Sequence, residues 1–144
     1  MGHGSLKRGP GVRPVPPGRP DTPGWLLERM EFDSFTVSVL ESVPNAPTLS
    51  EAESYALQDA HMAFLAGLHE AGDLQAAGPT VTPPDRTIRG FSIYRLPEDR
   101  VRELMAMDPA IRAGRLAVRI FTWLVPKGAV SFSAAPFPHS QAEL

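Results

Sequence analysis

The sequence predicts an α+β fold with six elements in the order strand, helix, strand, strand, helix, strand. Three observations predict it. Apolar and polar residues alternate over 32–41, 88–96 and 115–125, as is typical of half-buried strands. Apolar residues recur at helical spacing over 50–72 and 97–107. Breaks rich in Pro and Gly separate these stretches. The order is that of the split βαβ, or ferredoxin-like, arrangement (βαββαβ), in which a four-stranded antiparallel sheet carries two helices on one face.

The first half of this order begins with a strand over 32–41. There, Phe35, Val37 and Val39 alternate with Thr36, Ser38 and Leu40. Ser50 and Glu53 have the spacing of a capping box, so the long helix is expected to begin at this point. Gly72 can adopt the left-handed conformation that ends a helix. A weaker strand is expected over 75–82, followed by a turn at 83–86.

The second half begins with a clearer strand over 88–96. Pro97 suits a first helical turn, and Asp108 before Pro109 is expected to end the second helix. The last strand, 115–125, has the strongest alternation. One of its faces carries Leu116, Val118, Ile120 and Leu124, and the other carries Arg119, Phe121 and Trp123.

Three segments follow from this assignment. Residues 1–31 contain six Pro and six Gly and almost no apolar periodicity, which predicts a flexible arm. Residues 32–127 form the predicted domain, and 128–144 form an irregular C-terminal tail.

Composition narrows the classes of function. With a net charge of −2 over 144 residues, the chain has no basic footprint for nucleic acid. It has no Cys, so thiolate catalysis and Cys-based zinc sites are excluded. No apolar run is long enough to span a bilayer, and no signal peptide is recognisable, so we expect a cytoplasmic protein that does not bind membranes.

The candidate site rests on two titratable residues at apolar positions. His61 falls in the middle of the stripe formed by Leu57, Phe64, Leu65 and Leu68. Asp108 lies at the end of the second helical stripe, with Leu104. Each has a structural interpretation, His61 as a satisfied core residue and Asp108 as a turn residue. The functional alternative is an acid–base pair, since a histidine fixed by a carboxylate can exchange protons near neutral pH.

Other polar and aromatic residues are weaker candidates. Arg89, Tyr94, Arg119 and Trp123 lie on predicted strands, where they either line a ligand site or belong to a surface or an interface. His69 lies two helical turns from His61 and off the stripe, so we expect it to be solvated. No pair of His residues has metal-ligand spacing and no nucleotide-binding loop is present, so neither a metal nor a cofactor is predicted.

The short motifs around these residues resemble those of the YCII-related family. They are 60–65, 72–74 and 77–79, then 89–91, 107–110 and 113–114, and the resemblance spans about 32–127. It implies a ferredoxin-like fold, a dimer of the α-β barrel type, and a site around His61 and Asp108. A few relatives are similar to dehydrochlorinases or isomerases of ring-derived metabolites, although most members have no assigned activity. The chain departs from the family in its arm, its tail and its Pro83-Pro84 turn.

Two main hypotheses of function follow, beside a third in which the chain is a stable domain whose function lies in its arm or its tail. The first is a homodimer, packed sheet to sheet over Phe121 and Trp123, that binds an organic acid or ring-derived metabolite. In it, His61 and Asp108 catalyse proton transfer with elimination or isomerisation. The alternative is a non-catalytic module that senses a ligand or binds another protein.

Overall fold

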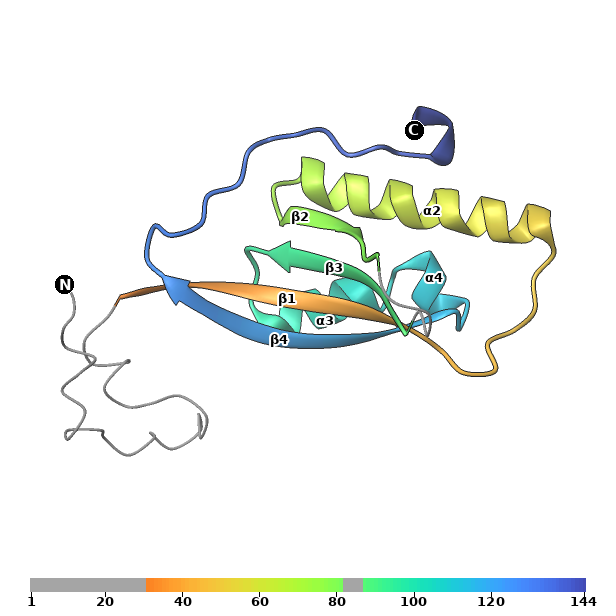
Figure 1. Ribbon diagram of the computed structural model, residues 1–144, viewed down its shortest axis with the longest axis horizontal. Helices are drawn as coiled ribbons and strands as arrows, with labels where there is room; N and C mark the ends of the chain where they lie inside the picture. Colours follow the sequence, from red (N-terminus) through yellow and green to blue (C-terminus); the bar gives the residue numbers. More distant parts are fainter. Residues whose placement is uncertain (1–30, 82–86) are drawn as a thin grey trace. The chain divides into compact units, whose positions relative to one another are not determined.

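The described residues of the computed structural model, 31–81 and 87–144, have the predicted α+β fold. The predictions for 1–30 and for the turn at 83–86 lie outside the described residues. The elements in chain order are β1 (Phe32–Ser42), α2 (Glu51–Glu70), β2 (Leu74–Pro79), β3 (Ile88–Tyr94), α3 (Glu98–Met105), α4 (Pro109–Arg112), β4 (Leu116–Pro126) and η3 (Gln141–Glu143) (Figure 1). Residues 34–124 and 131–144 form one compact unit, which holds all of the features described below.

The four strands form an antiparallel sheet in the order β2-β3-β1-β4, which is the ferredoxin-like topology. β3 lies between β2 and β1 and is antiparallel to both. The register places Thr36 opposite Tyr94 and Ser38 opposite Ser92. These four side chains therefore share one face of the sheet, because paired residues point to the same side.

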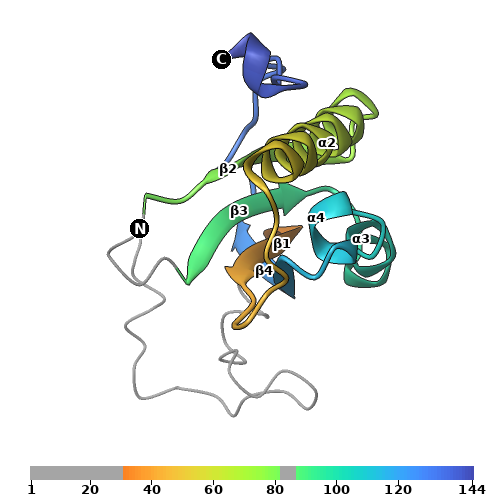
Figure 2. The same ribbon diagram turned by 90° about the vertical axis from the view of Figure 1, so that its right-hand side faces the viewer.

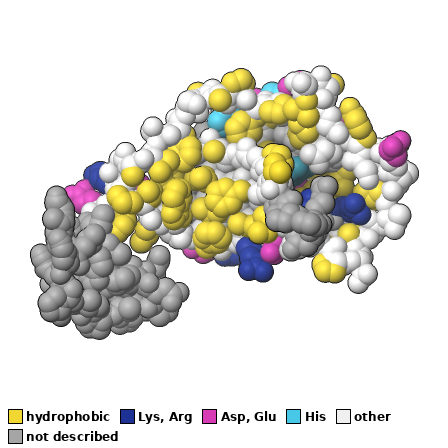
Figure 3. Space-filling model, viewed as in Figure 1, with side chains coloured by type: hydrophobic (Ala, Val, Ile, Leu, Met, Phe, Trp, Pro, Cys, Tyr) yellow, Lys and Arg dark blue, Asp and Glu magenta, His cyan; other side chains and the backbone are white. Residues whose placement is uncertain are grey.

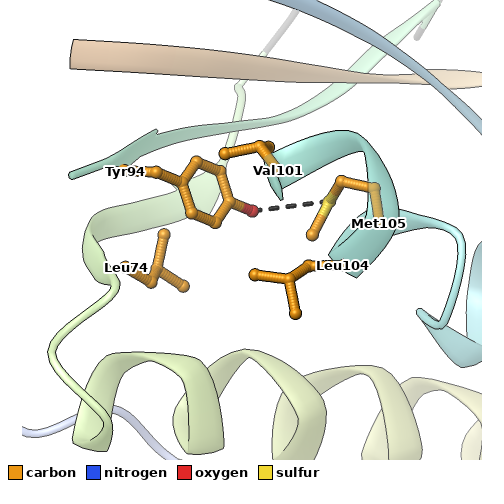
Figure 4. Close-up of a cluster of buried hydrophobic side chains, with 5 residues drawn as sticks. All are labelled: Leu74, Tyr94, Val101, Leu104 and Met105. Carbon is orange, nitrogen blue, oxygen red and sulfur yellow. Dashed lines mark hydrogen bonds between the residues drawn. The ribbon is translucent and has the colours of Figure 1, made fainter. Parts of the chain in front are cut away.

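The helices cover that face (Figure 2). The core between the helices and the sheet consists of Leu74, Tyr94, Val101, Leu104 and Met105, all almost fully buried (Figure 4). Phe64, Leu65 and Leu68 of α2 pack against this cluster, as do Val118 and Ile120 of β4. The predicted helical stripe and the predicted inner face of the last strand thus meet in one core.

Local sequence signals explain both ends of α2. The Ser50 side chain accepts a hydrogen bond from the Glu53 N–H at 3.1 Å, and Glu53 accepts one from the Ser50 N–H at 2.9 Å, so the predicted capping box is formed. Beyond the other end, Gly72 has φ +89°, the left-handed conformation that glycine adopts without steric cost. Among the described residues no helix has both the length and the apolar character needed to cross a membrane.

The segment after β3 differs from the prediction. The second helix, α3, ends at Met105, and a separate short helix, α4, begins at Pro109. The Asp108–Pro109 pair therefore starts a helix as well as following one. Pro109 suits the first helical position because it has no N–H to leave unsatisfied. Asp108 is its N-cap and accepts a hydrogen bond from the Ala110 N–H at 2.8 Å.

The other face of the sheet presents aromatic side chains. Phe91, Phe121 and Trp123 are 42%, 44% and 36% exposed. Figure 3 shows hydrophobic side chains gathered over the strands. Phe35 lies beneath them, 6.1 Å from the Trp123 ring and 5.4 Å, edge to face, from the Phe132 ring. This face is apolar enough to be an interface.

Candidate active site

The structure brings His61 and Asp108 into direct contact. His61 lies in the middle of α2 and Asp108 at the start of α4, 47 residues away. The His61 Nδ1 atom is 2.8 Å from Asp108 Oδ2 and 3.0 Å from Oδ1. Asp108 is 0% exposed and His61 8% exposed, so the pair is shielded from water. Shielding strengthens such an interaction, because the local dielectric is low.

Asp108 makes the contacts that both interpretations of its position in the sequence require. Its Oδ1 atom caps α4 by accepting the Ala110 N–H, and both of its oxygens face His61. A buried carboxylate is costly unless several donors compensate for its lost hydration. Here the cap supplies one donor and the imidazole another. The same two contacts hold the carboxylate in one orientation toward His61.

This arrangement fixes the tautomer of the imidazole. An ionised carboxylate can only accept hydrogen bonds, so Nδ1 must carry the proton that lies between the two side chains. In a neutral ring Nε2 then keeps its lone pair. In the described part of the chain no hydrogen bond engages Nε2. Nε2 is therefore the ring nitrogen that remains available to a bound molecule.

His61 lines a hollow of about 480 Å³, a volume within the range of small-molecule sites. The walls come from β1, α2, β2, β3, α4, the start of β4 and the C-terminal tail. Most of the lining side chains are apolar, among them Leu40, Leu57, Met62 and Leu65. His61 and Ser92 are polar groups within it, and Arg89 and Arg115 add positive charge. No Asp or Glu side chain among the described residues lines the hollow.

Of the other predicted binding residues, only Arg89 lies at the hollow. Arg119 is exposed on the opposite face of the sheet and pairs with Glu41 at 3.0 Å. Trp123 packs against Phe35 on that same face. The sequence left a ligand site and a surface or interface open for these two residues, and both lie on the face that Val118 and Ile120 do not share.

Tyr94 is a core residue and does not line the hollow. It is fully buried, and its hydroxyl donates a hydrogen bond to Met105 Sδ at 3.4 Å (Figure 4). Burial raises the pKa of the Tyr94 hydroxyl, with a smaller contribution in the same direction from the Asp108 charge; the hydroxyls of Ser38 and Ser92 oppose this shift. Tyr94 therefore keeps its phenol proton, and the nearby charge of Asp108 contributes to this.

The prediction that His69 is solvated is wrong. Its Nδ1 atom lies 2.8 Å from the Leu74 carbonyl oxygen and its Nε2 atom 2.8 Å from that of Ala135. Its ring stacks on Phe137 with centroids 3.9 Å apart. The cause is the C-terminal tail, which covers this part of α2. Sequence reasoning also missed Phe137 and Arg115 as lining residues, because neither lies on a periodic stripe that points to the site.

Comparison with known proteins identifies what this chain is similar to. Residues 37–124 match the profile of the YCII-related domain. No curated protein matches the chain. Among solved structures, the chain is similar to 5-chloro-2-hydroxyhydroquinone dehydrochlorinase from Burkholderia phenoliruptrix, solved in complex with 2,5-dihydroxybenzoquinone. The identity is 23% over 62% of this chain and 92% of that chain, with a TM-score of 0.47.

Proposed function

The chain belongs to the YCII-related domain family, and we propose that it is an enzyme in which His61 and Asp108 transfer protons to and from a small organic molecule. One observation carries the proposal. A histidine with one ring nitrogen held by a fully buried carboxylate lines a hollow of small-molecule size. A purely structural histidine requires no such hollow beside it.

The chemistry begins with His61 as a general base. Nε2 takes a proton from a carbon of the substrate, and Asp108 stabilises the imidazolium that forms. In an elimination, the electron pair left on that carbon forms a double bond as a leaving group departs from the neighbouring carbon. In an isomerisation, the pair shifts and the imidazolium returns the proton to a different carbon. Both reactions restore the neutral imidazole, either directly or by loss of its proton to water.

The lining of the hollow favours a particular class of substrate. Apolar walls suit a ring or a hydrocarbon body, and Arg89 and Arg115 suit a carboxylate or another acidic oxygen. Arg115 also donates a hydrogen bond to the Pro47 carbonyl, which holds its guanidinium in place. Arg89 has no ion-pair partner within the described ranges. We therefore assign the main contact with an anionic group to Arg89.

The exposed aromatic face of the sheet supports a further part of the proposal, that two copies pack sheet to sheet. Phe91, Phe121 and Trp123 lie on a face that no helix within 31–81 or 87–144 covers. A two-fold dimer would bury the same patch from both copies. Of these three aromatic residues Phe91 also lines the hollow, so the dimer would bring one wall of the hollow next to the interface.

The test is a thermal-shift screen of aromatic and alicyclic acids, followed by a search for turnover of each molecule that raises the melting temperature. We expect Arg89→Ala to weaken binding of an acid about tenfold or more and to leave its neutral amide analogue almost unaffected. We expect His61→Ala and Asp108→Asn to lower kcat by about 10²-fold or more.

Arg119→Ala is the matched control, since Arg119 is an exposed strand arginine that lies away from the hollow. Turnover that survives both the His61 and Asp108 changes would overturn the catalytic proposal. Binding without turnover would instead favour the ligand-sensing alternative.

A further inference from the structure

We propose that Phe137 and Pro138 of the C-terminal tail form a fixed wall of the hollow and limit the size of the molecules that reach His61. The inference rests on the proposed function for its biological meaning, because it concerns the same hollow. The structural evidence for it is separate and consists of the contacts between the tail and α2.

The tail is held along α2 by several contacts, although little of it is regular secondary structure (Figure 1). Gln141 donates hydrogen bonds to Asp59 from its backbone N–H at 2.8 Å and from its side chain at 2.9 Å. His139 lies 2.6 Å from Glu70. These contacts involve both the middle and the end of α2, so the tail is docked along the helix.

Phe137 lies between these attachments and is itself held on one side. Its ring stacks on His69 with an angle of 12° between the ring planes, and His69 is in contact with the carbonyls of Leu74 and Ala135. Phe137 also packs against the hydrophobic core and is only partly exposed. A stacked aromatic ring with its neighbour fixed has few alternative positions.

Phe137 influences which molecules fit into the hollow, because it forms part of the wall. Phe137 and Pro138 line the same hollow as His61 and Ser92. A flat ring on a wall favours flat, ring-bearing molecules and excludes bulkier ones by contact. Replacing it with a smaller side chain enlarges the hollow, and a larger side chain narrows it. Phe137 is therefore a residue that determines specificity, without a part in the proton transfer.

The test measures access to the hollow and needs no substrate. The chain has no Cys, so Ser92→Cys places a single thiol inside the hollow with little change in side-chain volume. Its labelling rate is measured in the full chain with two reagents, the small iodoacetamide and the bulky aromatic acid 5,5′-dithiobis(2-nitrobenzoate). Ser34→Cys, an exposed position away from the hollow, reports the intrinsic rate with each reagent.

We expect Phe137→Ala to speed labelling by the bulky reagent about tenfold and that by iodoacetamide about twofold, since a wider opening matters more for the larger molecule. Phe137→Trp is expected to slow the bulky reagent. The matched control is Phe132→Ala, a tail phenylalanine that packs on Phe35 and does not line the hollow. It should leave both rates unchanged.

Equal acceleration of both reagents, or equal effects of Phe137→Ala and Phe132→Ala, would overturn the inference. Circular dichroism of each variant shows whether it is folded; if Phe137→Ala unfolds, Phe137→Trp against the unchanged chain decides the question by itself. The outcome is independent of catalysis. Size-selective labelling can be found in a protein that turns over nothing, and turnover can be found in one whose tail does not limit access.

Discussion

The double role of Asp108 leads to a quantitative prediction about two substitutions at one position. Asp108→Asn has nearly the same shape as the native side chain. With its oxygen at the Oδ1 position it still accepts the Ala110 N–H, and its amide group then faces His61 Nδ1. The cap survives, and a neutral hydrogen bond replaces a charge-assisted one. Loss of the charge also removes the cost of burying it, so we expect a net destabilisation of about 1 kcal/mol.

Asp108→Ala removes both the N-cap of α4 and the hydrogen-bond partner of His61 Nδ1. The lost N-cap costs about 1 kcal/mol. The Nδ1–H group of His61, left buried without a partner, costs about 1–3 kcal/mol more. We expect a total loss of about 3 kcal/mol in the free energy of unfolding, which separates the two variants by about 2 kcal/mol.

The assay is urea unfolding of the three proteins at neutral pH, monitored by circular dichroism. Equal m-values show that the comparison concerns stability rather than a change in the unfolded state. If the two variants lose the same free energy, or if Asp108→Ala loses less than about 1 kcal/mol, the buried pair does not have the contacts that we describe.

Three more predictions concern other parts of the molecule. Ser50→Ala removes the capping box and should destabilise the protein by about 1 kcal/mol in urea unfolding, whereas an unchanged midpoint would contradict the assigned helix start. Hydrogen bonds to Glu70 and then Glu143 raise the pKa of His139 above its ordinary value of 6.5. The stabilisation from its charged form is therefore full below the unfolded pKa and is lost as pH rises through the folded value. The difference in melting temperature between the native protein and His139→Gln should be largest near about pH 5.5 and shrink by about pH 9, and a constant difference would refute this. Phe121→Arg places a charge on the open face of the sheet and should weaken dimerisation about 100-fold or more by light scattering, while an unchanged mass at the same concentration would exclude the sheet-to-sheet dimer.

Periodicity along the chain predicts most of the sheet and the long helix, because these elements each bury one face over many residues. The register shows what periodicity does not determine. In β1 the apolar set that includes Phe35 and Val37 lies on the open face, and the helices instead cover Thr36 and Ser38. Alternation separates the two sets but does not assign them to faces.

The proximity of His61 and Asp108 was predictable because both break an apolar helical stripe with a titratable group. The exact contact was not, because it depends on α4, a four-residue helix that is too short to show a period. That the tail lines the hollow could not be predicted from local sequence patterns either. Phe137 reaches the hollow through contacts with α2 residues about seventy positions earlier, and no spacing rule connects such positions.

The decisive property of the site is the tautomer of His61. Two-bond ¹H–¹⁵N correlation spectra of the ¹⁵N-labelled protein distinguish a protonated from an unprotonated ring nitrogen, and His61→Gln assigns the signals. We expect a proton on Nδ1 and a lone pair on Nε2 in the neutral ring. Spectra of Asp108→Asn should show the reverse. A neutral His61 with its proton on Nε2 in the native protein, or a tautomer that does not respond to Asp108→Asn, would contradict the claim that Asp108 prepares His61 to accept a proton.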